Sequence, residues 1–148
     1  MPTFRPARSE DLDDIIALLL DDDLGQRRET RDLTVYRAAF DAIEAEPQNQ
    51  IIVGEADGQI VATYQLTFIS GLSHQATRRA QIESVRVAAS LRGGGVGRHM
   101  MADAEARARA AGCRLMQLTT HATRNHARDF YDGLDFEPTH VGYKKQLR

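Results

Sequence analysis

The strongest local signal in this chain is Val87-Ala88-Ala89-Ser90-Leu91-Arg92-Gly93-Gly94-Gly95-Val96-Gly97-Arg98. It follows a β-like run over residues 81–87 and opens a long alanine-rich segment that predicts a helix. The glycines leave the backbone almost free of side chains, so several N–H groups can point at one anion at the helix start. The helix dipole adds about half a positive charge there. We interpret this stretch as a pyrophosphate-binding loop.

Two common phosphate-binding motifs do not fit this loop. The Rossmann fingerprint G-x-G-x-x-G needs its third glycine where the chain has Arg98, and no acidic residue stands out about 20 residues further on. A Walker A loop ends in G-K-[ST], whereas Gly97 is followed by Arg98 and His99. The pattern that does match is R-x-x-G-x-G, at Arg92, Gly95 and Gly97. A flexible loop before a helix would give the same short pattern. The choice between such a loop and a pyrophosphate-binding loop therefore depends on the rest of the chain.

Size and composition predict one ordinary globular domain over residues 1–148. The net charge of −2 gives no reason to expect nucleic acid as a partner. Cys113 is the sole cysteine, which excludes an internal disulfide and a cysteine-rich metal site. No apolar run approaches the roughly 18 residues of a membrane span. We therefore expect a cytoplasmic protein without a membrane or nucleic-acid partner.

Hydrophobic periodicity predicts alternating strands and helices along the whole chain. The expected order is β-α-α-β-β-β-α-β-α-β, an α/β chain with a mixed sheet flanked by helices. Asp57-Gly58 predicts a two-residue hairpin, and Gly112 is expected to end the long helix. The expected strands are 3–7, 51–56, 59–69, 80–87, 115–120 and 140–147, and the expected helices are about 11–20, 33–46, 95–111 and 124–134, with irregular chain at 26–33 and 71–76.

A second motif lies in the predicted last helix and the turn after it. The pattern A-x-x-F-Y-x-x-L-G-F matches Ala127, Phe130, Tyr131, Leu134 and Phe136, with Asp135 in place of its glycine. Aspartate tolerates the left-handed conformation that such a turn needs. With both motifs in this order, the chain resembles the GNAT family of N-acetyltransferases over essentially its whole length. The resemblance implies the acyl-coenzyme A N-acyltransferase fold and an enzyme that acetylates an amine.

The same resemblance implies acetyl-coenzyme A as co-substrate, with no metal. The family often carries an asparagine three residues before the motif's alanine, where it meets the pantetheine arm. Arg124 stands there and Asn125 comes one residue later, about 100° around the helix. Which of the two takes that role stays open. The residues implied in cofactor binding are Val85, Arg86, Val87, Arg92, Gly93, Gly94, Gly95, Val96, Gly97, Arg98, Arg124, Asn125, Ala127, Phe130 and Tyr131.

The resemblance makes Tyr131 the general acid for the departing thiolate, since a phenol with a pKa near 10 stays protonated at neutral pH. Glu83 is the candidate base. On a regular strand it shares a face with Gln81, Val85 and Val87, and a carboxylate there is costly unless it serves a function.

Two alternatives to a direct role of Glu83 as the base stay open. The histone-modifying branch of the family has its glutamate two residues earlier, so a water is an alternative link between Glu83 and the amine. A structural ion pair of Glu83 with Arg86 or Arg28 is a third reading.

For the acceptor, the resemblance implies a site between the first two helices and the central strands. Its mixed charge favours a small zwitterion or an amine-bearing metabolite, acetylated by direct attack in a ternary complex. A catalytically silent coenzyme A-binding regulatory module and a protein or peptide N-acetyltransferase are the alternatives. The family also allows a homodimer, for which the exposed face of the last strands is the expected place. The candidate acceptor residues are Asp22, Asp23, Arg27, Arg28, Phe68, His74, Glu83 and His121.

Overall fold

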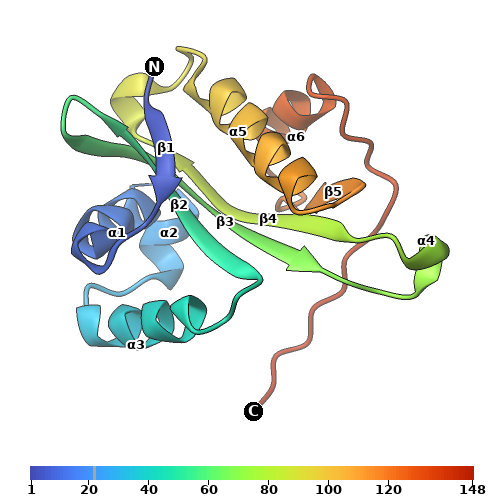
Figure 1. Cartoon of the computed structure of the whole chain (residues 1–148). Coiled ribbons are helices and arrows are strands. Elements are labelled where there is room, and N and C mark those ends of the chain that lie inside the picture. The colour runs from blue at the N-terminus through green and yellow to red at the C-terminus, as the bar shows by residue number, and fades with distance from the viewer. Residues whose placement is uncertain (22) are drawn as a thin grey trace.

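The protein is a five-stranded mixed sheet with helices on both faces, as a computed structural model shows (Figure 1). The structure describes residues 1–21 and 23–148, without the side chains of residues 23, 24 and 27. Strands β1 to β4 pair in antiparallel order, and β5 pairs with β4 in parallel. The strands are β1 (Thr3–Pro6), β2 (Asn49–Ala56), β3 (Gln59–Ile69), β4 (Arg79–Val87) and β5 (Leu115–Leu118).

The helices divide between the two faces of the sheet. One hydrophobic cluster joins α1 and α3 to the sheet, and another joins α5 and α6 to the opposite face (Figure 1). None of the described helices is long and apolar enough to cross a membrane. The helices and short helical turns are η1 (Ser9–Asp11), α1 (Leu12–Leu20), α2 (Asp23–Arg28), α3 (Leu33–Glu44), α4 (Ser73–Ala76), η2 (Ala89–Leu91), α5 (Val96–Ala110) and α6 (Asn125–Asp132).

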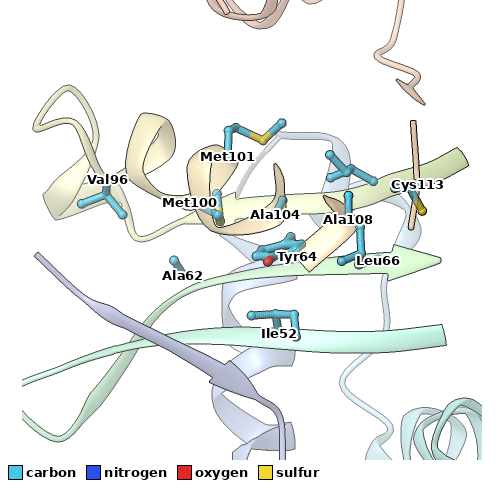
Figure 2. Packing of buried hydrophobic residues seen from close by; sticks show 12 residues of the cluster. Ile52, Ala62, Tyr64, Leu66, Val96, Met100, Met101, Ala104, Ala108 and Cys113 are labelled. Carbon is cyan, nitrogen blue, oxygen red and sulfur yellow. The ribbon is translucent and has the colours of Figure 1, made fainter. Parts of the chain in front are cut away.

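The main core lies between α5 and the sheet (Figure 2). Ala104 and Ala108 are almost fully buried, and their small side chains let α5 lie close to β3 and β4. A polar link crosses this layer, because the Tyr64 hydroxyl donates a hydrogen bond to Asp103 at 2.5 Å. Arg107 donates to the same carboxylate at 2.8 Å and to the Phe4 carbonyl at 3.2 Å. These bonds join β1, β3 and α5.

Most of the predicted elements are confirmed, including the hairpin. Asp57 and Gly58 both have a left-handed backbone, with φ of 52° and 76°, as a type I′ turn requires. The predicted irregular segment 26–33 is wrong in its first part, since α2 runs to Arg28. The inner face of α3 is also displaced from its predicted position: Phe40 is buried, whereas Val35 is 56% exposed.

The predicted last strand, 140–147, is wrong for this single chain. Residues 137–148, all of them described, contain neither helix nor strand and extend away from the domain (Figure 1). An alternating sequence becomes a strand only where a neighbouring edge supplies hydrogen bonds. The expected order of the first five strands is therefore correct, whereas the structure adds the short helices α2 and α4, the latter within the expected loop 71–76, and lacks the expected final strand.

One irregularity in β4 changes which side chains share a face. Gln65 pairs with Glu83, but Thr63 pairs with Arg86, so β4 carries one extra residue. This is a β-bulge at Ser84, which has φ of 53°. Val85 and Val87 pack against the cluster that contains Ile82, whereas Glu83 is exposed. The prediction that Glu83 shares a buried face with Val85 and Val87 is therefore wrong.

Candidate active site

A gap opens between β4 and β5 just beyond their last pair. The pairing runs from Arg79–Leu115 to Ile82–Leu118, after which β4 continues to Val87 while the other chain turns towards α6. The β5-facing edge of residues 83–87 thus presents backbone N–H and C=O groups to this gap. An extended molecule with amide groups can pair with such an edge as an added strand.

The glycine loop sits at the end of this gap, where α5 begins. Gly93 and Gly95 have φ of 81° and 89°, a left-handed region that favours glycine. The first backbone bond of the helix runs from the His99 N–H to the Gly95 carbonyl, at 3.1 Å. The N–H groups of Val96 and Gly97 precede it and have no acceptor within the helix. The loop therefore has the geometry of an anion site.

Gly97 serves packing as well as the loop. A Cβ at this position would lie 3.3 Å from Cζ of Phe130, so glycine allows α5 and α6 to approach closely. Arg92, on the N-terminal side of the loop, donates hydrogen bonds that hold the loop in place. Its Nε donates to the Val87 carbonyl at 3.2 Å, and an Nη donates to the Asp21 carbonyl at 3.0 Å. Arg92 thereby links the loop to the end of α1.

Tyr131 lies on α6, half-buried among aromatic rings. Its ring meets Phe130 and Phe136 edge-on, with centroids 5.1 and 5.8 Å apart. Burial raises the pKa of the Tyr131 phenol, and the positive charges of Arg124 and Arg86 partly oppose this rise. The phenol is therefore protonated at neutral pH and can donate a proton.

The candidate base Glu83 and the buried cation Arg86 both lie on β4. Glu83 is exposed beside Gln65, its partner on β3. Gln81, the family's other position for the glutamate, accepts a hydrogen bond from Gln117 at 2.7 Å. Arg86 is only 6% exposed and donates to the Val85 carbonyl at 2.9 Å. The bulge at Ser84 determines the face of the sheet on which Glu83 and Arg86 lie relative to Val85 and Val87. No local sequence signal indicates this bulge.

The remaining cofactor candidates flank Tyr131 at the start of α6. The helix begins at Asn125, with Arg124 as its N-cap, and both side chains are exposed. Ala127 is half-buried on the same helix. His121 is exposed in the segment between β5 and α6, where its Nδ1 lies 2.8 Å from the Thr123 hydroxyl.

The structure separates other predicted acceptor residues from the gap. Phe68 packs against the core, and the Arg78 Cζ lies over its ring at 5.5 Å from the ring centroid. On the sheet Phe68 pairs with Ala80, at the end of β4 that is far from the gap. His74 lies in α4, beyond that end. Arg28 is exposed and pairs with Glu29 at 3.7 Å. Asp22 and the side chains of Asp23 and Arg27 lie outside the described residues. No group of three or more metal-ligating side chains occurs in the part described.

This geometry defines a class of protein. A parallel strand pair that opens beside a glycine-rich helix start without a side-chain cap is suited to hold an extended phosphorylated thioester. The half-buried phenol of Tyr131, on the helix that follows β5, is a possible proton donor. The class is a coenzyme A-dependent acyltransferase.

Comparison with known proteins gives the family. The sequence profile of the Acetyltransferase (GNAT) family matches residues 12–136, and the chain belongs to this family. Aminoalkylphosphonate N-acetyltransferase of Salmonella typhimurium strain LT2 is 28% identical over 143 residues, which span 97% of this chain and 90% of that protein.

Two solved structures extend the comparison. The crystal structure of a transcriptional regulator from Bacillus halodurans C-125 is 37% identical, with a TM-score of 0.95 over 99% of this chain and 100% of that one. A putative acetyltransferase from Agrobacterium tumefaciens C58 is 27% identical, with a TM-score of 0.85 over 98% and 99%. The predicted family and fold class are confirmed, and the protein is an acetyl-coenzyme A-dependent N-acetyltransferase.

Proposed function

We propose that this enzyme moves the acetyl group of acetyl-coenzyme A to the primary amine of a small molecule, by direct attack in a ternary complex. The observation that carries the proposal is the gap between β4 and β5, which joins the bare start of α5 to the half-buried Tyr131. One extended molecule laid along this gap reaches both features.

Different backbone groups of the chain bind different parts of the cofactor. The N–H groups at Gly95, Val96 and Gly97 bind the pyrophosphate, helped by the dipole of α5. The edge of β4 at Val85 and Val87, which lies beyond the last pair with β5, binds the pantetheine amides. A backbone N–H at the bulge polarises the thioester carbonyl, because the extra residue of a bulge leaves the ladder.

The reaction then needs two proton transfers. The neutral amine nitrogen forms a bond to the thioester carbon, and collapse of the tetrahedral intermediate breaks the bond from carbon to sulfur. Tyr131 gives its proton to the departing sulfur. The amine's surplus proton goes to Glu83, directly or through a water, since this carboxylate is exposed beside the gap. The Tyr131 phenolate recovers a proton from solvent.

The acceptor we propose is a small amine that also carries an anionic group. Two observations support it. The Salmonella relative is an aminoalkylphosphonate N-acetyltransferase, and Arg86 and Arg124 are near enough to Tyr131 to act on its pKa. Arginine suits phosphonate and carboxylate groups because its planar fork can bind two oxygens at once.

A second function is favoured by one comparison. The Bacillus halodurans structure is described as that of a transcriptional regulator, so a coenzyme A-binding module without turnover is the alternative. Tyr131 and the gap would then serve binding alone. The homodimer and the cytoplasmic location expected from the sequence belong to the proposal as well.

Calorimetric titration with acetyl-coenzyme A, beside a Gly95→Glu variant, tests the binding half. We expect binding that the variant loses, because a carboxylate would stand in the anion site. Free-thiol release with aminoalkylphosphonates, amino acids and simple alkylamines then tests the transfer. Turnover that is highest with the anionic amines supports the proposed acceptor. Binding without turnover for any amine favours the regulatory module, and no binding to the unaltered protein refutes both.

A further inference from the structure

We propose that Gln81 and Gln117 form a further subsite for the acceptor, which binds a neutral group that both donates and accepts hydrogen bonds, a hydroxyl or a carboxamide. This subsite rests on the proposed function, because it serves the same acceptor. It adds a third recognised feature to the amine and the anionic group.

A row of polar side chains crosses the sheet on the face opposite α5. It consists of direct register partners on four neighbouring strands, Asn49, Thr67, Gln81 and Gln117. All four side chains are half-buried. Residues two apart on a strand share a face, so Gln81 lies on the same face as Glu83. The row therefore runs beside the candidate base.

The hydrophobic cluster on this face ends before the β4 and β5 part of the row. It packs α1 and α3 against Ile51, Val53 and Ile60, and none of its described members lies on β4 or β5. Figure 1 shows the same arrangement, with α1 to α3 towards the β1 and β2 side of the sheet and β5 at the opposite border. Gln81 and Gln117 are therefore open to a ligand on this face.

The hydrogen bonds within the row leave one donor and one acceptor for a ligand. At the β2 end, the Asn49 Oδ1 accepts bonds from Gln65 and Thr67, at 3.0 and 3.3 Å. At the β5 end, the Gln117 Nε2 donates to the Gln81 Oε1 at 2.7 Å. The remaining atoms of this pair, Gln81 Nε2 and Gln117 Oε1, have no partner among the described residues, and both reach solvent. An amide nitrogen and an amide oxygen together suit a hydroxyl or a carboxamide, because each of these groups both accepts and donates.

The amide pair lies beside the groups proposed for the reaction. Gln81 and Gln117 form the pair before the last one between β4 and β5, where the gap opens. Glu83 follows Gln81 by two residues, about 7 Å along the strand. Arg86 lies beyond Glu83 on the same face. An acceptor whose amine faces Glu83 can therefore direct its anionic group towards Arg86 and a neutral polar group towards the amide pair.

Matched acceptors test the subsite in the free-thiol assay. Serine, homoserine and asparagine are compared with the apolar partners 2-aminobutyrate, norvaline and leucine, and the phosphonate analogues of the same pairs are compared in the same way. In at least one pair we expect kcat/KM to be about 5- to 30-fold higher for the polar acceptor, because its apolar partner leaves the two amide atoms without hydrogen bonds.

The outcomes separate the subsite from the reaction. Equal kcat/KM values within every pair, or higher values for the apolar partners, refute the subsite and leave acetyl transfer itself in place. No turnover with any amine refutes the proposed function, and the subsite with it.

Two variants distinguish recognition from a structural role. Gln81→Met and Gln117→Met keep the length of the side chain but remove its amide, and each should abolish the preference for the polar acceptor through a rise in KM with little change in kcat. Asn49→Leu is the matched control, because it removes an amide from the β2 end of the row and should leave the preference unchanged. All three variants should keep their affinity for acetyl-coenzyme A in calorimetric titration.

A structural role gives a different result. If the amide pair only joins β4 to β5, its loss should disturb the gap, so Gln81→Met and Gln117→Met would lower acetyl-coenzyme A affinity and slow polar and apolar acceptors equally. That result, or a preference that survives in both variants, overturns the proposal.

Discussion

Replacing Gly95 by alanine tests the loop through its backbone alone. Gly95 is the N-cap of α5 and has φ of 89°. An L-residue in this region brings its Cβ too close to the neighbouring carbonyl oxygen, which costs about 1–2 kcal/mol. The added Cβ would also lie 3.3 Å from the Met1 Cε, the flexible end of a side chain that can move aside. The strain at the backbone is thus the main effect.

The free protein can relieve this strain by a change in the loop backbone, but that movement redirects the N–H groups of the proposed anion site. Acetyl-coenzyme A binding must then restore the strained form. We therefore expect Gly95→Ala to raise the dissociation constant of acetyl-coenzyme A by about 5- to 30-fold, which corresponds to 1–2 kcal/mol. Isothermal titration calorimetry measures this change directly.

The matched control is Gly58→Ala in the hairpin between β2 and β3. Gly58 has φ of 76°, and a Cβ there meets nothing within 4 Å. This variant carries similar backbone strain outside the proposed site, so its melting temperature should fall while its acetyl-coenzyme A affinity stays within about twofold of the unaltered protein. Unchanged affinity in Gly95→Ala, or an equal loss in both variants, would refute the assignment of the loop.

Three other substitutions test chemistry and stability. Tyr131→Phe removes the proposed proton donor and should lower kcat by about 10²–10⁴-fold with little change in cofactor affinity. Burial raises the pKa of Tyr131, so the phenol should keep its proton up to its ordinary pKa of about 10. The steady-state rate of the unaltered enzyme should therefore not fall through deprotonation of Tyr131 below that pH. Asp11→Asn should cost about 1.5–3 kcal/mol in urea unfolding at pH 7, because Asp11 accepts two bonds from Arg5, at 2.8 and 3.0 Å. Arg5 lowers the folded pKa of Asp11, so its stabilisation is present above the unfolded pKa of about 3.9, and the difference between the two proteins should shrink as the pH falls through the folded pKa. Tyr64→Phe should cost about 1–2 kcal/mol without changing cofactor affinity, since Asp103 keeps its bond to Arg107.

The sequence predicted best what depends on neighbouring residues. Asp57-Gly58 indicated the hairpin because few residue pairs accept two left-handed positions. The glycines of the loop indicated the start of α5 for a similar reason. Asp135 takes the left-handed turn of the second motif, with φ of 66°. Such local rules need no knowledge of the rest of the fold.

What the sequence could not predict depends on distant partners. The acceptor side is the main example, since nothing near Phe68 or His74 in the chain indicates that they lie at the far end of β4 from the gap. The inner face of α3 was displaced because Phe40, rather than Val35, meets the sheet. Periodicity finds an amphipathic helix, but its exact rotation follows from packing.

The bulge at Ser84 shows how one such feature shapes the whole site. Without it, side chains would alternate regularly from Ile82 to Val87, and Arg86 would share the face of Ile82 under α5. The extra residue turns Val85 and Val87 to that core instead and puts Arg86 on the opposite face, the one that bears Glu83. It also frees backbone groups just beyond the last β4–β5 pair. A single left-handed serine therefore sets the positions of the β4 edge proposed for the cofactor, of the candidate base and of the cation proposed for the acceptor. Deleting Ser84 should restore regular pairing and abolish turnover in a chain that still folds, whereas turnover retained by that folded variant would show that the bulge is not required.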